Sequence, residues 1–253
     1  MMGHYPDLAG KTVLVTGASS GIGRALAIAL SRQQANVIIT GRDQTRLHAT
    51  QQAMDSTATI IPADLTDKND RERLVQILPA LDGLCHAAGI INPFPIRYID
   101  EEQFDKVFNI NGSAPILLTA RLLGKKKINE AGSVVFISSI ASERGMKGGS
   151  VYSASKAALE AFSRTITLEH ASKRIRSNCL KPALVKTAIY DQAKAHAKAA
   201  GALDNYEDYV SRYPLGIGAP EDVAAAALFL LSDASRWITS TSLTLDGGLS
   251  ASI

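Results

Sequence analysis

Tyr152 and Lys156 are the residues whose types and spacing point most directly to chemistry. They lie four residues apart in YSASK, at the start of a stretch with helical apolar periodicity, so both side chains should share one face of a helix. An ammonium beside a phenol favours the phenolate and lowers the pKa of the tyrosine from about 10 toward the range useful for general acid–base catalysis. Ser139 is predicted at the carboxyl end of a strand, where it can donate a hydrogen bond to a carbonyl oxygen. These three residues predict proton transfer at a carbonyl or alcohol group.

A glycine-rich turn, TGASSGIG at 16–23, follows a predicted strand and opens a predicted helix. Gly17 permits a tight turn, Gly21 lets the backbone approach a pyrophosphate, and Gly23 allows close packing of helix on strand. Free N–H groups at the start of the helix favour an anion. The residues predicted to bind a dinucleotide here are Gly17, Ser19, Ser20, Gly21, Ile22 and Gly23. An ordinary tight loop would also explain the glycines, and a Tyr and Lys one turn apart occur by chance in many helices.

The end of the second predicted strand bears on the choice of cofactor. An NAD enzyme places an acidic residue there to hold the ribose 2′-hydroxyl, whereas this chain has Gly41 followed by Arg42. The Arg42 guanidinium can grip a 2′-phosphate, which favours NADP(H) while leaving NAD(H) possible. In the alternative, Arg42 is a solvated loop charge and Asp43 caps the next helix. After the third strand, Asp64 can accept a hydrogen bond from the adenine amino group beside Leu65, or it can cap a helix.

Short β-branched runs alternate with longer amphipathic runs along the whole chain, the βαβα rhythm of a parallel sheet. The predicted strands are 12–16, 36–40, 58–61, 83–86, 133–138, 175–180 and 242–245, and the predicted helices are 21–32, 43–53, 67–78, 101–124, 151–171 and 220–231. Most strands are continuously apolar, as strands covered on both faces must be. We therefore predict one α/β domain over 1–253, a Rossmann-type doubly wound parallel sheet of about seven strands with helices on both faces. The Ala- and Lys-rich stretch 187–213 is predicted to be a substrate lid, or else a surface helix pair.

The composition excludes several classes of protein. Of the 253 residues 46% are apolar, enough to fill a core, so a disordered chain is excluded. The 27 basic residues hardly exceed the 24 acidic ones, which speaks against nucleic-acid binding. The longest apolar run, 223–231, is too short for a membrane span of roughly twenty residues, and no signal or transit peptide precedes the first strand, which predicts a cytoplasmic protein. Cys85 and Cys179 lie far apart without metal-ligand spacing, so we expect buried thiols and no metal site.

In their order along the chain, TGASSGIG, Ser139, YSASK and the closing LDGG resemble the motifs of the short-chain dehydrogenase/reductases. The resemblance covers essentially the whole chain and implies a nicotinamide cofactor and a catalytic tetrad of Asn111, Ser139, Tyr152 and Lys156. It implies that Tyr152 is the acid–base and that Ser139 orients the carbonyl. Lys156 would bind the nicotinamide ribose and lower the pKa of Tyr152, and Asn111, favoured over Asn109 by the register, would hold a relay water.

Two departures from the family pattern concern the cofactor site. The usual NNAG reads His86-Ala87-Ala88-Gly89 here, and a structural role for His86 is expected rather than a catalytic one. The usual Pro-Gly reads Pro182-Ala183, which adds a methyl group near the nicotinamide. The further cofactor-binding residues that the resemblance implies are Ala87, Ala88, Gly89, Pro182, Val185 and Thr187.

The substrate is less well defined than the reaction. The side chains expected around it are Ile91, Phe94, Ala141, Met146, Val151, Ala183 and the segment 187–213. This set is mostly apolar and contains no fixed cationic group, so a small charged substrate is not expected. The overall resemblance is to 3-oxoacyl-[acyl-carrier-protein] reductases, which implies a carrier-bound ketone. A free sugar, a steroid-like ketone or another small alcohol is the alternative, and a non-catalytic NADP(H) sensor is a remote one because Tyr152 and Lys156 are both present.

Two surfaces are expected to bind protein partners. Five cations could dock an acidic acyl-carrier protein, or could simply be solvated helix ends: Lys125, Lys126, Lys127, Lys173 and Arg174. The stretches 101–124 and 151–171 carry more apolar residues than one packed face needs, which predicts a homo-oligomer, and the resemblance implies a tetramer built from dimers. These apolar residues are Phe104, Val107, Ile116, Leu117 and Leu118 in the first stretch, and Ala157, Leu159, Phe162, Ile166 and Leu168 in the second.

Overall fold

The computed structural model describes residues 3–191, 194 and 210–251. A seven-stranded sheet runs through it in the order β3-β2-β1-β4-β5-β6-β7, and every neighbouring pair is parallel. The strands are β1 Thr12–Thr16, β2 Asn36–Gly41, β3 Thr59–Pro62, β4 Leu81–His86, β5 Ile128–Ile137, β6 Arg176–Pro182 and β7 Ser242–Leu245. The order reverses direction between β1 and β4, which is where a doubly wound sheet binds its ligands. The predicted fold class is confirmed.

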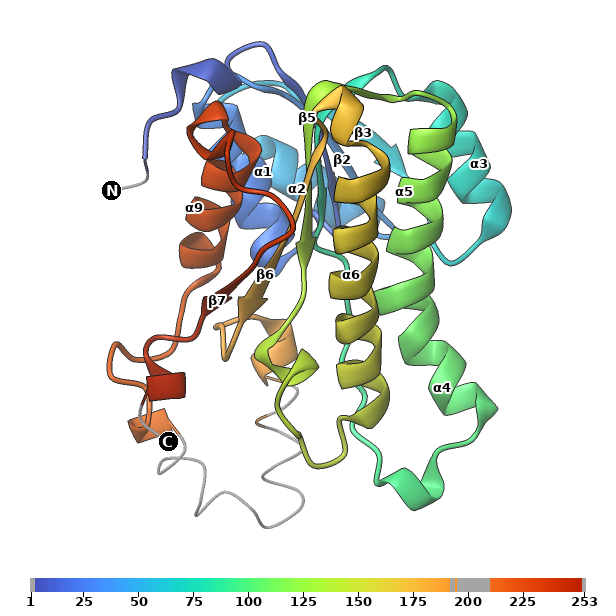
Figure 1. The fold of residues 1–253 in the computed structure, drawn as a ribbon, viewed down its shortest axis with the longest axis vertical. Helices are drawn as coiled ribbons and strands as arrows, with labels where there is room; N and C mark the ends of the chain where they lie inside the picture. The colour runs from blue at the N-terminus through green and yellow to red at the C-terminus, as the bar shows by residue number, and fades with distance from the viewer. Residues whose placement is uncertain (1–2, 192–193, 195–209, 252–253) are drawn as a thin grey trace.

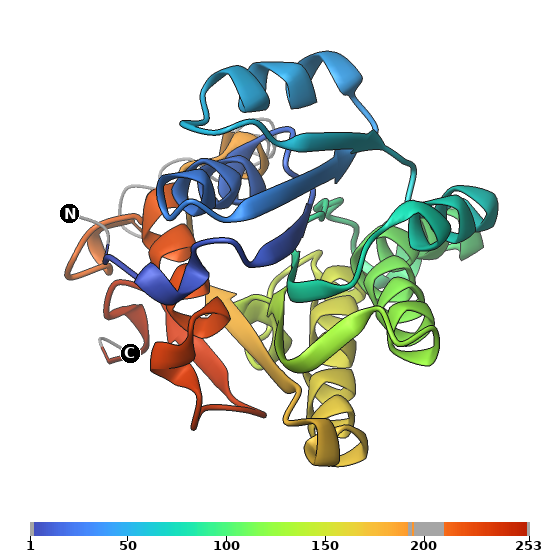
Figure 2. The same ribbon diagram turned by 90° about the horizontal axis from the view of Figure 1, so that it is seen from above.

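Helices cover both faces of this sheet (Figures 1 and 2). They are α1 Gly21–Arg32, α2 Gln44–Gln52, α3 Lys68–Ile77, α4 Glu101–Phe108, α5 Ala114–Gly124, α6 Ser150–Glu169 and α9 Pro220–Leu231. One buried cluster joins α1, α2 and α9 to the sheet, and a second joins α3, α5 and α6 to the opposite face. Burial on both faces explains why the strands have short apolar runs rather than a polar and apolar alternation.

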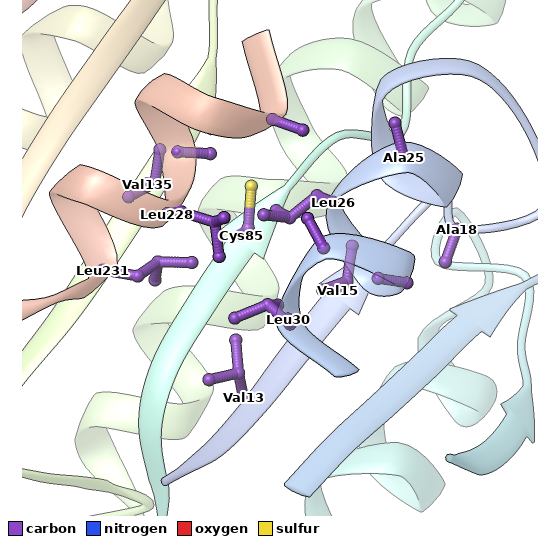
Figure 3. Close-up of a cluster of buried hydrophobic side chains, with 14 of the residues drawn as sticks. Val13, Val15, Ala18, Ala25, Leu26, Leu30, Cys85, Val135, Leu228 and Leu231 are labelled. Atoms are coloured by element: carbon purple, nitrogen blue, oxygen red, sulfur yellow. The ribbon is translucent and has the colours of Figure 1, made fainter. Parts of the chain in front are cut away.

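The core between the sheet, α1 and α9 depends on a close approach of helix to strand (Figure 3). A Cβ atom at Gly83 of β4 would lie 3.0 Å from Leu231 and 3.1 Å from Val13, so a larger residue would separate α9 from the sheet. Cys85 of the same strand is fully buried in this core, and burial raises the pKa of its thiol to about 12. Cys85 and Cys179 are both free and buried, as predicted.

The stretch predicted as one helix over 101–124 is divided by a π turn, Asn109–Ser113. Pro115 lies in the first turn of α5 and has no N–H group to donate to the carbonyl four residues earlier, that of Asn111. A π turn widens the helix by one residue at the point where the regular hydrogen bond is missing. The single predicted helix was wrong here because the proline was not weighed against the apolar periodicity.

β6 also differs from the expected apolar strand. All seven of its residues are buried, yet several are polar or charged. Asn178 donates to the Ile238 carbonyl at 3.0 Å and accepts from the Thr241 N–H at 3.2 Å, so its amide is paired on both sides. A buried polar side chain is tolerated when it is hydrogen-bonded, which single-residue hydropathy does not reveal.

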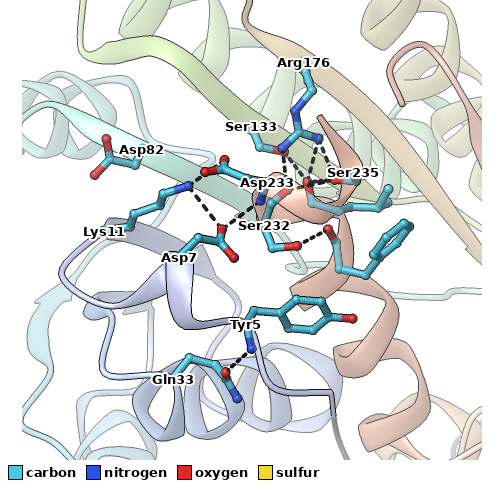
Figure 4. A network of polar contacts seen from close by, with 12 residues as sticks. Tyr5, Asp7, Lys11, Gln33, Asp82, Ser133, Arg176, Ser232, Asp233 and Ser235 are labelled. Carbon is cyan, nitrogen blue, oxygen red and sulfur yellow. Dashed lines mark hydrogen bonds and ion pairs between the residues drawn. The ribbon is translucent and has the colours of Figure 1, made fainter. Parts of the chain in front are cut away.

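Arg176, at the start of β6, is the centre of a polar network at the amino end of the sheet (Figure 4). Its guanidinium donates to the Leu230 carbonyl at 2.9 Å, to the Ser235 hydroxyl at 2.9 Å and to the Ser232 carbonyl at 3.1 Å. The Ser133 hydroxyl donates to the same Leu230 carbonyl at 2.7 Å. The network therefore holds the end of α9 against β5 and β6.

Arg176→Ala should lower the free energy of unfolding by about 3 kcal/mol, because buried carbonyl and hydroxyl groups lose their donor. Urea unfolding followed by circular dichroism measures this change. Arg236→Ala is the matched control, since Arg236 is exposed in the same loop region, and it should change the stability by less than about 0.5 kcal/mol. Equal stability of the two variants would show that the Arg176 network contributes little.

Candidate active site

Two cavities meet at the carboxyl ends of the strands. The first, here called the glycine-turn cavity, has a volume of about 320 Å³ and runs from Arg42 and Asp64 past the turn after β1. The second, the tyrosine cavity, has a volume of about 530 Å³ and contains Ser139, Tyr152 and Lys156. Both are lined by a shared set of residues, Ile22, Ala87, Gly89, Thr187 and Ile189. A ligand with two ends can therefore occupy both cavities at once.

The glycine turn has the shape that a pyrophosphate requires. Gly17 has a φ of +67°, and a Cβ atom there would lie 2.6 Å from the Ala88 backbone nitrogen, so only glycine fits. A Cβ atom at Gly23 would lie 2.5 Å from the Gly17 carbonyl oxygen, so the first turn of α1 packs directly on the loop. Ser20, the N-cap of α1, makes no side-chain cap hydrogen bond, which leaves first-turn N–H groups available to an anion.

The predicted cofactor-binding residues are brought together at these cavities. The glycine-turn cavity is lined by Gly17, Ser19, Ser20, Gly21, Ile22, Arg42, Asp64, Leu65, Ala87, Ala88, Gly89 and Thr187. The tyrosine cavity is lined by Tyr152, Lys156, Pro182 and Val185. Gly23 lines neither cavity and supports the turn from below. The residues present thus fit a dinucleotide whose adenosine end lies near Arg42 and whose nicotinamide end lies near Pro182.

Two arginines lie at the adenosine end of the glycine-turn cavity, although only Arg42 was predicted there. Arg46 lines the same cavity and also forms an ion pair with Asp43 at 2.6 Å. Asp43 caps α2 by accepting from the Arg46 N–H at 3.0 Å, and hydrogen bonds from Arg46 hold the pKa of Asp43 below its usual value. The predicted cap at Asp43 and an Arg42 side chain in the cavity therefore coexist. Arg46 lies in the first turn of α2, four residues after Arg42, and this closeness along the chain could have indicated the second arginine.

Asp64 lines the glycine-turn cavity but does not cap α3. Its Oδ1 accepts from the Thr66 N–H at 2.9 Å and from the Thr66 hydroxyl at 2.7 Å, which forms a local turn. The N-cap of α3 is Asp67, which accepts from the Asp70 N–H at 2.8 Å. The helix-cap alternative for Asp64 was therefore wrong, and its contact with adenine stays a prediction.

Ser139 and Tyr152 face each other in the tyrosine cavity. Ser139 follows the end of β5 at Ile137, and its Oγ accepts from the Ala141 N–H at 3.2 Å. Burial raises the pKa of Tyr152, and a hydrogen bond with the Ser139 hydroxyl partly opposes this. The direction is opposite to the predicted lowering of the Tyr152 pKa, because the cost of burying a phenolate outweighs the hydrogen bond with Ser139 in the protein alone.

Lys156 lies below Tyr152 on the same face of α6. Its Nζ is 5.7 Å from the centre of the Tyr152 ring and donates to the Ile137 carbonyl at 2.8 Å. Burial lowers the pKa of this ammonium to about 8. The lysine is thus fixed at the end of β5, one turn from Tyr152, and has two further N–H donors for a ligand.

Asn111 is fully buried in the π turn and is fixed by its side chain. Its Nδ2 donates to the Ile90 carbonyl at 2.8 Å, and its Oδ1 accepts from the Ile90 N–H at 2.9 Å. The side chain therefore secures the loop after β4, while the backbone carbonyl of Asn111 lacks its regular helical donor because residue 115 is proline. This carbonyl is the group with which Asn111 could hold a relay water.

His86 lies beneath the site and lines neither cavity. It is 3% exposed, stacks on Phe136 with 5.1 Å between ring centres, and its Nε2 lies 2.8 Å from the Thr119 hydroxyl. Burial, helped by the charge of Lys156, lowers the pKa of His86 to about 3, so the ring is neutral at physiological pH. These contacts join β4 to β5 and α5, which fits the structural role expected for the histidine.

The wall of the tyrosine cavity agrees only in part with the predicted one. Ile91, Ala141, Met146 and Ala183 line it, whereas Phe94 and Val151 do not. The lining residues that the sequence did not indicate are Ile137, Ser138, Ile140, Arg144, Gly145, Leu184 and Leu249. Arg144 matters most, because the expectation of a wall without a cation was wrong. Of the predicted lid 187–213, Thr187, Ile189, Tyr190 and Tyr213 line the cavity, and the greater part, 192–193 and 195–209, lies outside the described residues.

The sheet order, the glycine turn and the Ser-Tyr-Lys constellation define a nicotinamide-dependent oxidoreductase site. A family model described as enoyl-(acyl carrier protein) reductase matches residues 17–250. The 3-oxoacyl-[acyl-carrier-protein] reductase of Rickettsia felis is 34% identical over 244 residues, covering 96% of this chain and 98% of the relative. The chain belongs to the short-chain dehydrogenase/reductase family and is an NAD(P)(H)-dependent oxidoreductase.

Solved structures agree with this assignment. Levodione reductase superposes with a TM-score of 0.89 at 26% identity, covering 97% of this chain and all of that one. A short-chain dehydrogenase/reductase from Brucella melitensis gives a TM-score of 0.88 at 26% identity, covering 98% of this chain and 99% of that one. Within 3–191, 194 and 210–251, no helix combines the length and apolar character that crossing a membrane demands.

Proposed function

We propose that the protein reduces the ketone of a 3-oxoacyl thioester with NADPH in the cytoplasm. The observation that carries this proposal is the meeting of Ser139, Tyr152 and Lys156 in the tyrosine cavity, which shares lining residues with the glycine-turn cavity. The similarity to the Rickettsia felis enzyme supports the thioester as substrate. A free small ketone or alcohol is the second candidate, because a cavity of about 530 Å³ can enclose such a molecule completely.

Each of the four residues Ser139, Tyr152, Lys156 and Asn111 has a separate role in the proposed reaction. The nicotinamide, when bound, supplies the hydride to the carbonyl carbon. The Ser139 hydroxyl donates a hydrogen bond to the carbonyl oxygen, and the Tyr152 hydroxyl gives that oxygen its proton. The Lys156 ammonium stabilises the phenolate that remains, and it holds a ribose hydroxyl with its free N–H groups. The Asn111 carbonyl holds the water that returns a proton to this site.

The preference for NADPH follows from charge at the adenosine end. Arg42 and Arg46 both line the glycine-turn cavity, and Gly41 leaves no carboxylate at the end of β2. A 2′-phosphate would be attracted by both guanidinium groups, whereas a ribose hydroxyl would find no acceptor at Gly41.

The five predicted cations do not form a docking surface beside this site. Lys125, Lys126 and Lys127 precede β5, and Lys173 and Arg174 precede β6. In a parallel sheet the start of each strand is at the edge opposite its carboxyl end, so these cations lie at the edge away from the two cavities. The solvated-helix-end alternative is therefore favoured within a single chain, and the carrier-docking surface stays a prediction.

A screen of NADPH oxidation tests the proposed function. Acetoacetyl thioesters, free diketones and keto sugars are compared at equal concentration, and the highest kcat/KM is expected for a thioester. A higher kcat/KM for a free ketone would favour the second candidate. Absence of turnover with every ketone, together with absence of NADPH binding by fluorescence, would overturn both.

We also propose that the chain forms a homo-oligomer through α4, α5 and α6. Val107, Leu118, Leu159 and Ile166 from the predicted apolar set are buried in the chain's own core. The others that stay exposed are Phe104 at 41%, Leu117 at 48% and Leu168 at 80%. These exposed side chains on neighbouring helices can be covered by a second copy.

Light scattering at micromolar concentration should give a mass of at least two chains. Leu117→Glu should shift the mass toward the monomer, because a buried charge in an apolar contact is costly. The control is Ile77→Glu, on an exposed side chain of α3 outside this face. A monomeric mass for the unmodified protein would overturn the proposed assembly.

A further inference from the structure

Arg144 is a charged side chain in the wall of the tyrosine cavity. Apart from Lys156, which is held by the Ile137 carbonyl, it is the only charged residue among the described residues that line this cavity. No described aspartate or glutamate lines the cavity. The wall is otherwise largely apolar, and Arg144 is only partly buried in it, so its guanidinium is the charged group that a ligand in this cavity can meet.

The segment that carries Arg144 is anchored to the sheet. Glu143, its neighbour, forms an ion pair at 2.5 Å with the Nζ of Lys181, whose side chain is 6% exposed in β6. The Arg144 N–H donates to the Ile140 carbonyl at 3.1 Å, which closes a turn directly after Ser139. Arg144 therefore lies five residues after Ser139, on a short turn that directly follows it, and lines the same cavity.

The Arg144 guanidinium has no ion pair of its own within the described part of the chain. Asp246 is the carboxylate that its charge influences, but Asp246 is already occupied by the Ser250 N–H at 2.7 Å and the Gly248 N–H at 3.1 Å. Partial burial opposes ionisation of Asp246, yet these hydrogen bonds and the charge of Arg144 hold its pKa below the usual value. Asp246 is thus turned toward its own loop, and the donors of Arg144 remain available to a ligand.

We infer that Arg144 is a specificity residue that binds an anionic group of the substrate while Ser139 and Tyr152 bind its ketone. This inference rests on the proposed function and narrows its substrate class to ketones that carry a carboxylate or a phosphate. The anion can be the carboxylate of a compact oxo acid or the phosphate of a phosphopantetheine arm. Both accept the paired hydrogen bonds that a guanidinium donates. The Glu143–Lys181 ion pair positions the segment so that this contact is made in one geometry.

Matched pairs of substrates test the inference. Acetoacetate is compared with methyl acetoacetate, and acetoacetyl-phosphopantetheine with the uncharged acetoacetyl thioester of N-acetylcysteamine. For each pair, the ratio of kcat/KM for the anionic over the neutral member is measured in the unmodified protein and in Arg144→Gln. Loss of a charge-assisted contact should lower the ratio about tenfold in the pair whose anion reaches Arg144. Arg144→Lys should restore part of it, and Lys147→Gln, an exposed change in the same segment, should leave it unchanged.

The two pairs distinguish the source of the anion. A fall in the acetoacetate pair alone assigns a carboxylate, and a fall in the phosphopantetheine pair alone assigns a phosphate. An unchanged ratio in both pairs, or an equal loss for neutral and anionic members, would overturn the inference even if the protein is an active ketone reductase.

Binding without turnover separates this inference from the proposed function. Butyrate is titrated calorimetrically into the protein with NADPH, and Arg144→Gln should weaken its binding about tenfold. If no ketone is reduced but butyrate binding depends on Arg144, the proposed function fails and the anion site stands. If ketones are reduced but Arg144→Gln changes neither butyrate binding nor the two kcat/KM ratios, the anion site fails and the proposed function stands.

Discussion

Tyr152→Phe should lower kcat about 100-fold or more while NADPH still binds. The substitution removes only the hydroxyl that gives the carbonyl oxygen its proton, and general acid–base catalysis contributes about 10²–10⁴-fold. The phenyl ring still fills the same space between Ser139 and Lys156, so the cavity wall is preserved. Stopped-flow turnover of the best ketone and the fluorescence of bound NADPH measure the two effects separately.

Tyr98→Phe is the matched control for this experiment. Tyr98 is 58% exposed, lies against Arg97 and lines neither cavity, so the loss of its hydroxyl should leave kcat within about twofold. If Tyr152→Phe retained more than about a tenth of kcat, Tyr152 would not be the proton donor. A loss of NADPH binding in the same variant would instead indicate that the hydroxyl is needed to hold the cofactor.

The sequence predicted the sheet and its ends well because local signals and burial agree there. The glycine turn at Gly17 and the Tyr152–Lys156 spacing each combine a local conformation with a neighbouring element, and the structure brings all four tetrad residues to the sheet edge or directly beneath it. The predictions of secondary structure and burial failed where the local sequence pattern and the tertiary contacts favour different conformations. Pro115 changed a helix into two helices with a π turn, and tertiary hydrogen bonds allowed β6 to be buried although it is polar.

Position across the sheet was the hardest property to predict. The lysines before β5 and the arginine before β6 read as a basic cluster along the sequence, but strand direction places them at the edge opposite the site. Arg144 shows the opposite case: a charge in a loop is usually solvated, yet Arg144 lines the cavity, and its neighbour Glu143 forms an ion pair with Lys181 of β6. Neither the edge on which the cations lie nor the place of Arg144 can be obtained from the local sequence, because both depend on contacts between residues far apart in the chain.

Replacing Gly41 by Asp together with Arg42 by Ala should shift the preference from NADPH toward NADH by about ten- to a hundred-fold in kcat/KM. Removing the Arg42 guanidinium removes a charge-assisted contact to the 2′-phosphate. The new carboxylate can be accommodated, because a Cβ atom at Gly41 would lie 3.6 Å from the Ser19 hydroxyl and 3.7 Å from Leu47, which is ordinary van der Waals contact. There it can accept from a ribose 2′-hydroxyl and repel a phosphate.

The contribution of Arg46 is measured in the same series. Arg46→Ala should reduce the preference for NADPH by less than the change at Arg42, because the Arg46 guanidinium is already paired with Asp43 at 2.6 Å. Arg24→Ala, an exposed charge on α1 that lines neither cavity, should leave the ratio unchanged and so controls for net charge. If the unmodified protein prefers NADH, or if the double variant leaves the ratio of kcat/KM for NADPH over NADH unchanged, the two arginines do not bind the 2′-phosphate.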